Sequence, residues 1–527
     1  MAVRAVIPTG RTLQRGSFTI TYPPQAIDLT SCSVTAANVT GTCTGSDGAW
    51  SASINKVQGV VLTGSVSLVT IDIAVKAPGS YTITFASPSF LDDSGAAVTI
   101  GLDPIAMVAV GTPTWTTSPT LVPATTTTTP TATVVTPGMY VTNLGAGTGH
   151  SCGVERGTGK AWCWGWNSYG QIGDGTSGHG GFGADRTAPA PVAEGRIFTS
   201  LVAGDSHTCG LATSGTAYCW GYNQYGQVGD GASGDGGTGA NRAAPVPVAG
   251  ARSFASLVAG DSHTCGVEAG TGKAWCWGFN GYGQLGDGTS GNGGSSANRT
   301  APVEVADGRL FSSLTAGGQF TCGVEQATGK AWCWGWNDSG QLGDGTSINQ
   351  TAPVAVAAGK AFESLAAGYM HICGIETGTR LAWCWGGNPF GGLGHGTSGN
   401  GSSTANRGEP VAVTGGKTFA SLSAGHFHTC GVEQGTGKAW CWGYNASGQV
   451  GDGASATSAY DFTANRTSPV AVSGDKVFAS LAAGHSHTCG VESGTGKGWC
   501  WGSNATGQLG DGTVNDHSLP VAVRHNP

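Results

Sequence analysis

The sequence predicts an all-β protein in which a β-sandwich domain and a linker precede a seven-bladed β-propeller. The composition is the first reason: 93 Gly and 22 Pro stand against only 24 basic and 31 acidic side chains in 527 residues, which is typical of short strands joined by tight turns. The second reason is a unit that recurs seven times after residue 139 without helical periodicity. The third is a pair of cysteines at a nearly constant spacing in every unit.

The first 111 residues predict a separate β-sandwich. Apolar and polar residues alternate in the segments SFTITY (17–22), VSLVTIDIA (66–74) and YTITF (81–85), as expected for strands with one buried face. Residues 112–138 are rich in Thr and Pro and have little to bury, so we expect an extended linker. No run of apolar residues is long enough for a membrane span. The N-terminus lacks the order of a signal peptide, so for an exported protein we expect this sequence to be the processed form.

The repeated unit, residues 139–527, has the length of a four-stranded propeller blade. It reads SLxAGxxHTCGVExGTGKAWCWGxNxxGQLGDGT, then a glycine-rich insert, then NRTAPVxV, and its first cysteine recurs every 51 to 59 residues. The copies enter with Met139-Tyr140-Val141 and leave with Pro520 to Val523. We expect these entering and leaving segments to complete one blade together and so close the ring.

The two cysteines of each unit are predicted to face each other across a hairpin. In the first copy, placing Cys152 opposite Cys163 also sets Glu155 opposite Lys160, with residues 156–159 as the turn. Directly opposed residues lie within disulfide reach, and the two charges would form a cross-strand ion pair.

Two irregular copies test this register. The second copy is one residue shorter, and a deletion in the turn keeps Cys209 opposite Cys219 while Ala212 and Thr216 replace the charge pair. In the fifth copy Glu376 faces Leu381, with Arg380 moved into the turn.

The predicted disulfides favour an oxidising compartment outside the cell or at its surface. Zinc is the alternative, but its paired cysteines are usually about two to four residues apart. We predict eight disulfides, the first of which lies in the sandwich: Cys32–Cys43, Cys152–Cys163, Cys209–Cys219, Cys265–Cys276, Cys322–Cys333, Cys373–Cys384, Cys430–Cys441 and Cys489–Cys500.

The segments AG-x-x-H, WG-x-N, GQLGDGT and PV resemble the repeat of the regulator of chromosome condensation family, over residues 139–527. The resemblance implies a seven-bladed propeller that acts through protein contacts on its faces. This fold hosts a nuclear exchange factor, ubiquitin-ligase modules and secreted bacterial inhibitors of β-lactamase, so it does not define one function. Paired cysteines and an acidic balance favour the secreted bacterial type and argue against nucleic acid as a partner.

The first domain resembles the cohesin-like sandwich in FTITYPPQAIDLTSCSV, VSLVTIDIAVKAPGSYTITF and LDDSGAAVTI. Its expected first strand is poorly represented by AVRAVIPTG. That departure leaves room for completion by a strand of another chain.

Three recurring residue types invite a site, and each has a structural alternative. A histidine precedes the first cysteine by two residues in six copies, and Phe320 takes its place in the fourth copy. We expect a hydrogen-bonded structural role, with a local metal site at His426, His428, His485 and His487 as the alternative. The Trp-Cys-Trp segments are expected to pack blade on blade, with sugar binding as the alternative. The Gly-Asp-Gly segments are expected to form turns, with calcium binding as the alternative.

The positions that vary inside the constant template are the predicted contact surface. They follow the AG step or lie in the insert before NR, and they include Asp205, Asp261, Tyr369, His426, His485, Tyr460 and Phe462. No nucleophile with a placed base, paired carboxylates or phosphate loop is evident, so we expect a protein that is not an enzyme and needs no cofactor or metal.

The function expected from these features is that of an extracellular structural or cell-surface protein, with a filament subunit among the forms considered. It would display a disulfide-stapled propeller for adhesion or protein contacts. Its partners would be another protein or copies of itself joined by strand exchange through the N-terminal segment. A soluble secreted binding protein or inhibitor, and a carbohydrate-binding adhesin, are the alternatives.

Overall fold

The computed structural model describes residues 138–524 apart from 179–182, 235–237 and 457–460, together with nine strands between residues 2 and 102. The chain divides into two units, residues 1–130 and 131–527. No helix in these described parts is long and apolar enough to cross a membrane.

Strands of the first unit form two antiparallel sheets, ordered β3-β6-β1-β9 and β4-β5-β2-β7-β8. Their bounds are β1 (Ala2–Ile7), β2 (Arg15–Thr21), β3 (Ile27–Ser33), β4 (Val39–Ser46), β5 (Ala49–Lys56), β6 (Gly64–Val75), β7 (Thr84–Leu91), β8 (Ala97–Val98) and β9 (Gly101–Leu102). The segment expected to make a poor first strand is β1, which pairs with both β6 and β9. The packing of the two sheets, the Cys32–Cys43 disulfide and the linker lie outside the described residues, so the cohesin-like sandwich stays a prediction.

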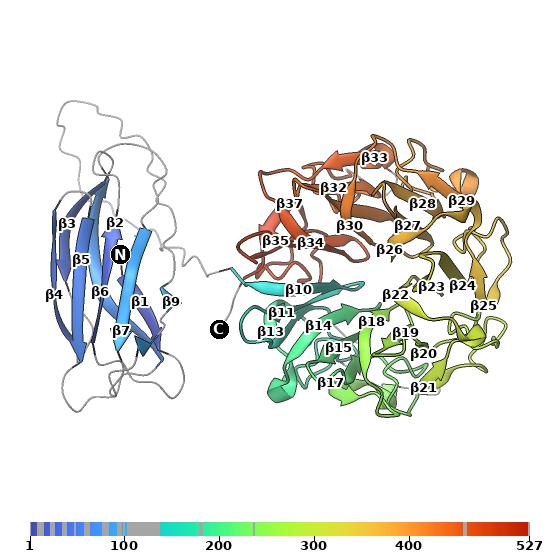
Figure 1. The fold of residues 1–527 in the computed structure, drawn as a ribbon, viewed down its shortest axis with the longest axis horizontal. Helices are drawn as coiled ribbons and strands as arrows, with labels where there is room; N and C mark the ends of the chain where they lie inside the picture. The colour runs from blue at the N-terminus through green and yellow to red at the C-terminus, as the bar shows by residue number, and fades with distance from the viewer. Residues whose placement is uncertain are drawn as a thin grey trace, which may run out of the picture. The chain divides into compact units, whose positions relative to one another are not determined.

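The second unit is a seven-bladed propeller, and each blade is a four-stranded antiparallel sheet (Figure 1). Blades 1 to 4 consist of β10 (Val141–Ala146), β11 (His150–Glu155), β12 (Ala161–Gly165) and β13 (Arg186–Pro191); β14 (Phe198–Ala203), β15 (His207–Ala212), β16 (Ala217–Gly221) and β17 (Arg242–Pro247); β18 (Phe254–Ala259), β19 (His263–Glu268), β20 (Ala274–Gly278) and β21 (Arg299–Glu304); β22 (Phe311–Ala316), β23 (Phe320–Glu325), β24 (Ala331–Gly335) and β25 (Gln350–Ala355).

Blades 5 to 7 repeat the same pattern. They consist of β26 (Phe362–Ala367), β27 (His371–Glu376), β28 (Ala382–Gly386) and β29 (Arg407–Ala412); β30 (Phe419–Ala424), β31 (His428–Glu433), β32 (Ala439–Gly443) and β33 (Arg466–Ala471); β34 (Phe478–Ala483), β35 (His487–Glu492), β36 (Gly498–Gly502) and β37 (His517–Ala522). Six single-turn 3-10 helices lie in connections of the described propeller: η1 (Ala193–Gly195), η2 (Thr238–Ala240), η3 (Ala306–Gly308), η4 (Ala357–Gly359), η5 (Ser403–Ala405) and η6 (Phe462–Ala464).

The ring closes differently from the sequence-based expectation. The entering strand β10 belongs to blade 1 and the leaving strand β37 to blade 7, so no blade is shared between the two ends. Bridges join Gly138 to Arg524 and Tyr140 to Lys497, and the amide of Met139 donates to the carbonyl of Val523 at 2.9 Å. The Tyr140–Lys497 bridge has the same form as those between other blades, such as Lys160–Ile197. The prediction was wrong because VTNLGA of β10 is itself a degenerate copy of the first blade strand, FTSLVA in β14.

The seven cysteine pairs of the propeller are disulfides, and the predicted hairpin register is confirmed. Cys152 pairs with Cys163, and Val154 with Ala161, while in the shorter second copy Cys209 still faces Cys219. The remaining five disulfides are Cys265–Cys276, Cys322–Cys333, Cys373–Cys384, Cys430–Cys441 and Cys489–Cys500.

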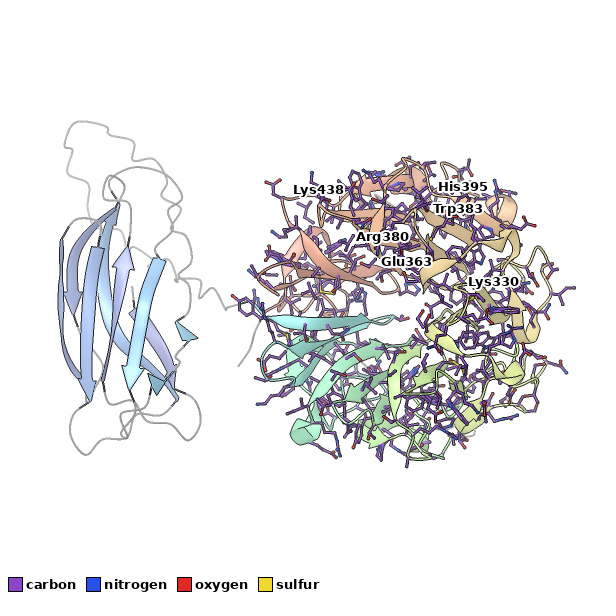
Figure 2. The ribbon with its side chains drawn as sticks, viewed as in Figure 1. Lys330, Glu363, Arg380, Trp383, His395 and Lys438 are labelled. Atoms are coloured by element: carbon purple, nitrogen blue, oxygen red, sulfur yellow. A yellow bond between two sulfur atoms is a disulfide. The ribbon has the colours of Figure 1, made fainter. Side chains whose placement is uncertain are left out.

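The ion pairs of these hairpins differ from the expected cross-strand pair. In blades 3 to 6 the carboxylate at the Glu155 position pairs with a cation that precedes the first strand of its own blade, as Glu268 does with Arg252 at 3.0 Å. The lysine that the register of the first copy places across the hairpin is therefore not the partner in blades 3, 4 and 6, so that prediction was wrong there. In blade 5 the turn residue Arg380 reaches Glu363 at 2.9 Å, on the neighbouring strand (Figure 2).

Blades pack on one another through the tryptophan that follows the second cysteine of each blade; the segment is Trp-Cys-Trp except in blade 2, where it is Tyr-Cys-Trp. Trp220 of blade 2 is fully buried in one cluster with the Cys152–Cys163 disulfide of blade 1, and its indole N–H donates to the Gln171 carbonyl at 2.9 Å. All seven equivalent tryptophans are 0% exposed. Gly173 (φ +76°) must lack a side chain, since a Cβ there would lie 2.6 Å from the Trp220 Nε1. The structure therefore supports blade packing, and these rings are not available to a sugar.

Candidate functional site

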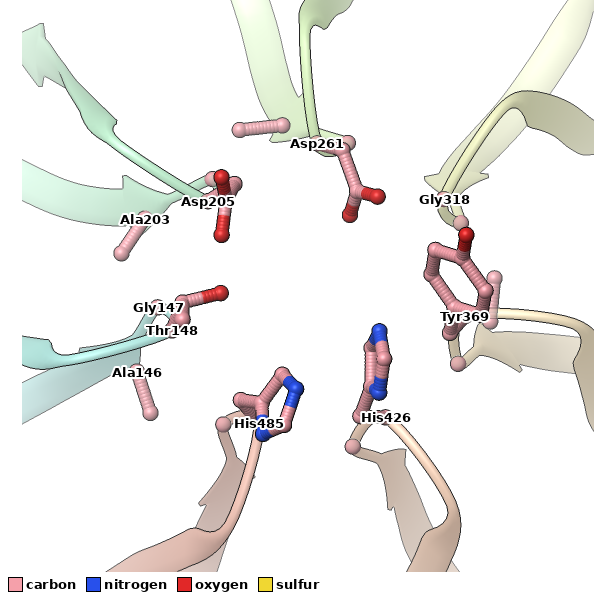
Figure 3. Close-up of a pocket in the computed structure, with 18 of the residues that line it drawn as sticks. Ala146, Gly147, Thr148, Ala203, Asp205, Asp261, Gly318, Tyr369, His426 and His485 are labelled. Carbon is pink, nitrogen blue, oxygen red and sulfur yellow. The ribbon is translucent and has the colours of Figure 1, made fainter.

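The loops between the first and second strands of the seven blades meet at the propeller axis and surround one mouth of its central channel. Each loop presents the residue that follows the AG step, and the seven residues differ: Thr148, Asp205, Asp261, Gly318, Tyr369, His426 and His485. They line a cavity of about 110 Å³, and Figure 3 shows Asp205, Asp261, Tyr369, His426 and His485 around its centre, each from a different blade. We call these seven residues the channel mouth.

The loop conformation follows from the A-G-x-x-H segment. The amide of Gly147 donates to the His150 carbonyl at 2.9 Å, which closes a tight turn between β10 and β11. A Cβ at Gly147 would lie 2.4 Å from the Gly204 carbonyl oxygen of the next blade, so only glycine allows the loops to approach so closely.

Backbone hydrogen bonds run from loop to loop around the mouth. The amide of Tyr369 donates to the His426 carbonyl at 3.3 Å, and the amide of His485 donates to the Gly147 carbonyl at 3.1 Å. Because the main chain makes these bonds, the side chains of the mouth residues are left to point into the cavity.

Burial sets the charge of the mouth. It raises the pKa of Asp261 to about 7, with the Asp205 carboxylate as the second cause, and it lowers the pKa of His426 to about 3. The pKa of His485 is also lowered by burial. Both imidazoles are therefore neutral at pH 7. The described lining residues include no Lys or Arg, so the mouth carries acidic but no permanent basic groups.

Aromatic rings form the wall opposite the two carboxylates. The rings of Tyr369 and His426 have centroids 4.0 Å apart, and His426 stacks on His485 at 3.9 Å. Trp336 continues this wall outward, with its centroid 6.0 Å from that of Tyr369. The mouth thus combines the edges of stacked rings with carboxylates.

A chain of partly exposed rings extends from this wall over blades 4 to 1. Neighbouring centroids are 4.6 to 6.3 Å apart. The rings belong to Trp166, Tyr169, Tyr222, Tyr225, Phe279, Tyr282 and Trp336, which we call the aromatic arc. It lies on the same face as the mouth, since the amide of Tyr222 donates to the carbonyl of Ser206, the residue next to Asp205.

Five of the seven predicted contact residues thus lie together at the mouth: Asp205, Asp261, Tyr369, His426 and His485. Phe462 does not line the cavity, but its ring lies 5.8 Å from that of Phe390, which contacts the mouth residue Tyr369 through Phe427. Tyr460 lies outside the described residues. The aromatic arc was missed by sequence reasoning. Its signal is the residue after WG and the residue before the GQ step, which are aromatic in the first three copies.

The histidines before the first cysteines have a structural role in the propeller. The Nε2 of His207 lies 2.8 Å from the Thr264 hydroxyl of the next blade, and that hydroxyl donates to the Gln227 carbonyl at 2.9 Å. The hydroxyl proton is thus used by the carbonyl, so the imidazole must donate from Nε2. Six blade pairs share this bond, closing with His487 and Ser151.

Blade 4 lacks this histidine, and the next blade lacks its hydroxyl partner. Where Phe320 replaces the histidine, Ile372 replaces the threonine of the next blade, and the two lie in one apolar cluster, each 0% exposed. His428 and His487 are likewise committed to blade contacts, so they do not join His426 and His485 in a four-histidine site. Within the described parts of the chain, no three His, Cys, Asp or Glu side chains are grouped so that they could hold a metal ion.

The Gly-Asp-Gly segments hold their own loops. Asp174 accepts from the Asn167 side chain at 3.5 Å and pairs with Arg186 at 2.6 Å. Asp230, Asp287 and Asp452 make equivalent pairs, and in blade 7 His517 takes the place of arginine opposite Asp511. These contacts fit the predicted turn-forming role.

Family comparisons agree with this geometry. The family model described as the RCC1-like domain matches residues 106–463, more than half of the chain, and the regulator of chromosome condensation (RCC1) repeat matches residues 436–491. The chain belongs to the RCC1-like domain family.

Two relatives show the range of proteins to which this RCC1-like chain is similar. The ultraviolet-B receptor UVR8 of Arabidopsis thaliana is 28% identical over 401 residues, which cover 74% of this chain and 83% of the receptor. The E3 ubiquitin-protein ligase HERC2 of Homo sapiens is 28% identical over 269 residues, which cover 50% of this chain but 5% of the ligase.

Solved structures share the propeller fold. Yeast RCC1 (Prp20), in its crystal structure with Kap60, matches with a TM-score of 0.58 at 19% identity, over 78% of this chain and 91% of that one. Human WBSCR16 matches with a TM-score of 0.59 at 17% identity, over 69% and 95% of the two chains. At these identities the likeness carries the fold alone.

Proposed function

We propose that this RCC1-like protein is an exported, non-catalytic binding protein that contacts a protein partner with the face of the propeller that carries the channel mouth. One observation carries the proposal: in a frame repeated seven times, the varying residues converge on one cavity. Repeated residues build the blades, whereas side chains that differ from blade to blade provide an asymmetric surface suited to one partner.

Disulfides support a location outside the cell. All seven blades are crosslinked by buried disulfides, which form and persist in oxidising compartments. The N-terminal unit and the linker would then display the propeller at a cell surface or in a filament. The secreted bacterial type belongs to this proposal and rests on the same disulfides.

The relatives are compatible with a binding role. One solved structure contains yeast RCC1 (Prp20) bound to Kap60. Another, with a TM-score of 0.52, is that of Prp20p from Saccharomyces cerevisiae, which was studied with its binding to Gsp1p and histones. These partners belong to those proteins. For this chain they support only the idea that a propeller of this family binds proteins.

A blocking variant tests the proposal. Thr148→Trp would fill the mouth, whereas Gln434→Trp places the same side chain in an exposed hairpin turn at the opposite ends of the blade strands. We expect a partner identified by crosslinking on the native protein to bind the Gln434→Trp variant normally and the Thr148→Trp variant weakly. Equal binding to both variants would place the partner elsewhere and reject the proposal.

Carbohydrate binding is the second candidate, and the aromatic arc favours it, because partly exposed rings can stack on sugars. A glycan array would test it. Binding that is lost in Tyr225→Ala and kept in Gln434→Trp would support the adhesin, whereas an array without any bound glycan would remove it.

A further inference from the structure

The channel mouth has a chemical asymmetry that singles out one type of ligand group. Asp205 and Asp261 project into it from blades 2 and 3, and Tyr369, His426 and His485 form the wall from blades 5 to 7 (Figure 3). Among the described lining residues, no lysine, arginine or charged imidazole lies beside the carboxylate of Asp261. Asp205 and Asp261 are half-buried and repel each other, and a cation between them would relieve that repulsion.

We propose that the channel mouth binds the guanidinium group of an arginine that a protein partner inserts along the propeller axis. Asp205 and Asp261 accept its N–H groups, and the ring edges of Tyr369, His426 and His485 line the other side of the cavity. The proposal rests on the proposed function and names the anchor of its partner.

Geometry favours a planar cation over a compact one. The mouth wall is a stack of rings, with centroids 4.0 Å apart from Tyr369 to His426 and 3.9 Å from His426 to His485. A guanidinium is weakly hydrated and offers several N–H donors in one plane, whereas an ammonium is a strongly hydrated point charge. Two carboxylates from adjacent blades match a group that donates from more than one edge.

The surroundings favour an arginine carried by a protein. The aromatic arc lies beside the mouth on blades 1 to 4, with seven partly exposed rings in sequence. Aromatic side chains of this kind are enriched in protein interfaces, where a central charged anchor is often surrounded by apolar contacts that exclude water. A free amino acid would use only the mouth, and its own carboxylate would be repelled by Asp205 and Asp261.

Small arginine derivatives test the proposal on the full chain. N-acetyl-arginine amide should bind saturably in calorimetry and change the fluorescence of the Trp336–Tyr369 wall, whereas N-acetyl-citrulline amide, which has the same shape without the charge, should not. N-acetyl-lysine amide should bind roughly tenfold more weakly or less. Equal binding of the citrulline or lysine compound would overturn the proposal, as would saturable binding of none.

Substitutions locate the site. Asp205→Asn and Asp261→Asn should each weaken the arginine compound by roughly tenfold or more, since a charge-assisted bond is lost. Asp338→Asn is the matched control, because it makes the same change from carboxylate to carboxamide at an exposed residue of a blade 4 loop on the same face. It should leave binding unchanged. An equal loss in all three variants would overturn the proposal, because the effect would then be one of general charge.

Two further results separate this proposal from the function on which it rests. If free arginine binds much more tightly than N-acetyl-arginine amide, the mouth is a site for a small molecule. That result would overturn the proposal that it binds an arginine side chain of a protein partner. A partner that Thr148→Trp excludes but Asp205→Asn and Asp261→Asn still bind normally would overturn the guanidinium site and leave the binding face intact.

Discussion

The bond from histidine to threonine between neighbouring blades can be measured with a double-mutant cycle, because the chain contains its own apolar alternative. In blades 6 and 7 the Nε2 of His428 lies 2.9 Å from the Thr488 hydroxyl. Between blades 4 and 5, Phe320 and Ile372 hold the same two positions. The perturbation is therefore to copy the second pair onto the first.

The single changes should be unequal. His428→Phe removes one donor but leaves the Thr488 hydroxyl bonded to the Gln449 carbonyl at 2.9 Å, so it should cost about 1 kcal/mol. Thr488→Ile leaves the His428 N–H buried without an acceptor, which should cost about 1–3 kcal/mol. The Gln449 carbonyl keeps the Trp501 indole as a donor in both cases, at 2.9 Å.

The double variant His428→Phe/Thr488→Ile should be more stable than the sum of the single effects by about 1–3 kcal/mol, because no polar group is then left unpaired. Guanidinium-induced unfolding with the disulfides intact measures this coupling. His207→Phe combined with Thr488→Ile, which do not contact each other, is the control pair and should be additive. Additivity of the contacting pair within about 0.5 kcal/mol would refute the reasoning.

Three other predictions concern pH, crosslinks and the mouth. The propeller should lose stability as pH falls from about 6.5. Burial lowers the pKa values of the six blade-contact histidines to about 3 or 4, so they stay neutral in the folded chain while the unfolded chain takes up protons; each histidine should cost about 2 kcal/mol of stability by pH 5. The raised pKa of Asp261 acts in the opposite direction, but it is one group against six. A flat unfolding midpoint between pH 7.5 and 5 would contradict this. The change Cys209→Ala/Cys219→Ala should cost about 2–4 kcal/mol in the same assay, and alkylation of the unreduced, denatured protein should label no propeller cysteine. Binding of N-acetyl-arginine amide should strengthen from pH 5 to 8 and release a proton, because a cation favours the ionised form of Asp261, whose pKa is about 7. Asp205, Tyr369, His426 and His485 are the other titratable groups at the mouth. His426, whose pKa is about 3, stays neutral over this range, and burial lowers the pKa of His485. An affinity independent of pH in calorimetry would argue against Asp261 as a partner.

Internal repetition made much of the fold predictable. Seven copies reveal the number of blades, and the one-residue deletion between Cys209 and Cys219 selects the hairpin register without any structure. The wrong predictions concern contacts between parts of a blade that the hairpin register does not pair. The cation that pairs with Glu268 is Arg252, which lies before the first strand of the blade rather than across the hairpin. Such a contact depends on how long side chains cross from strand to strand, and a repeat pattern does not contain that information.

Contacts between blades left a weaker trace in the sequence. The histidine partners were not predicted, because threonine lies on the next blade and one whole repeat away, as His207 and Thr264 do. The signal was nevertheless present in the joint change to Phe320 and Ile372, which becomes meaningful only when the blades are known to pack in order around a ring.

Two positions of one short loop show why the channel mouth varies while its frame does not. In AG-x-x-H, the histidine side chain is buried and bonded to the next blade, so a change there requires a second change, as at Phe320 and Ile372. The residue after AG contributes its backbone to the ring of loops, as Tyr369 does toward His426, while its side chain enters the cavity. Substitution at this position therefore leaves the bonds between blades intact. The fold holds seven independently variable positions around one axis, and this freedom is the physical basis for proposing a specific ligand there rather than on the repeated surfaces of the blades.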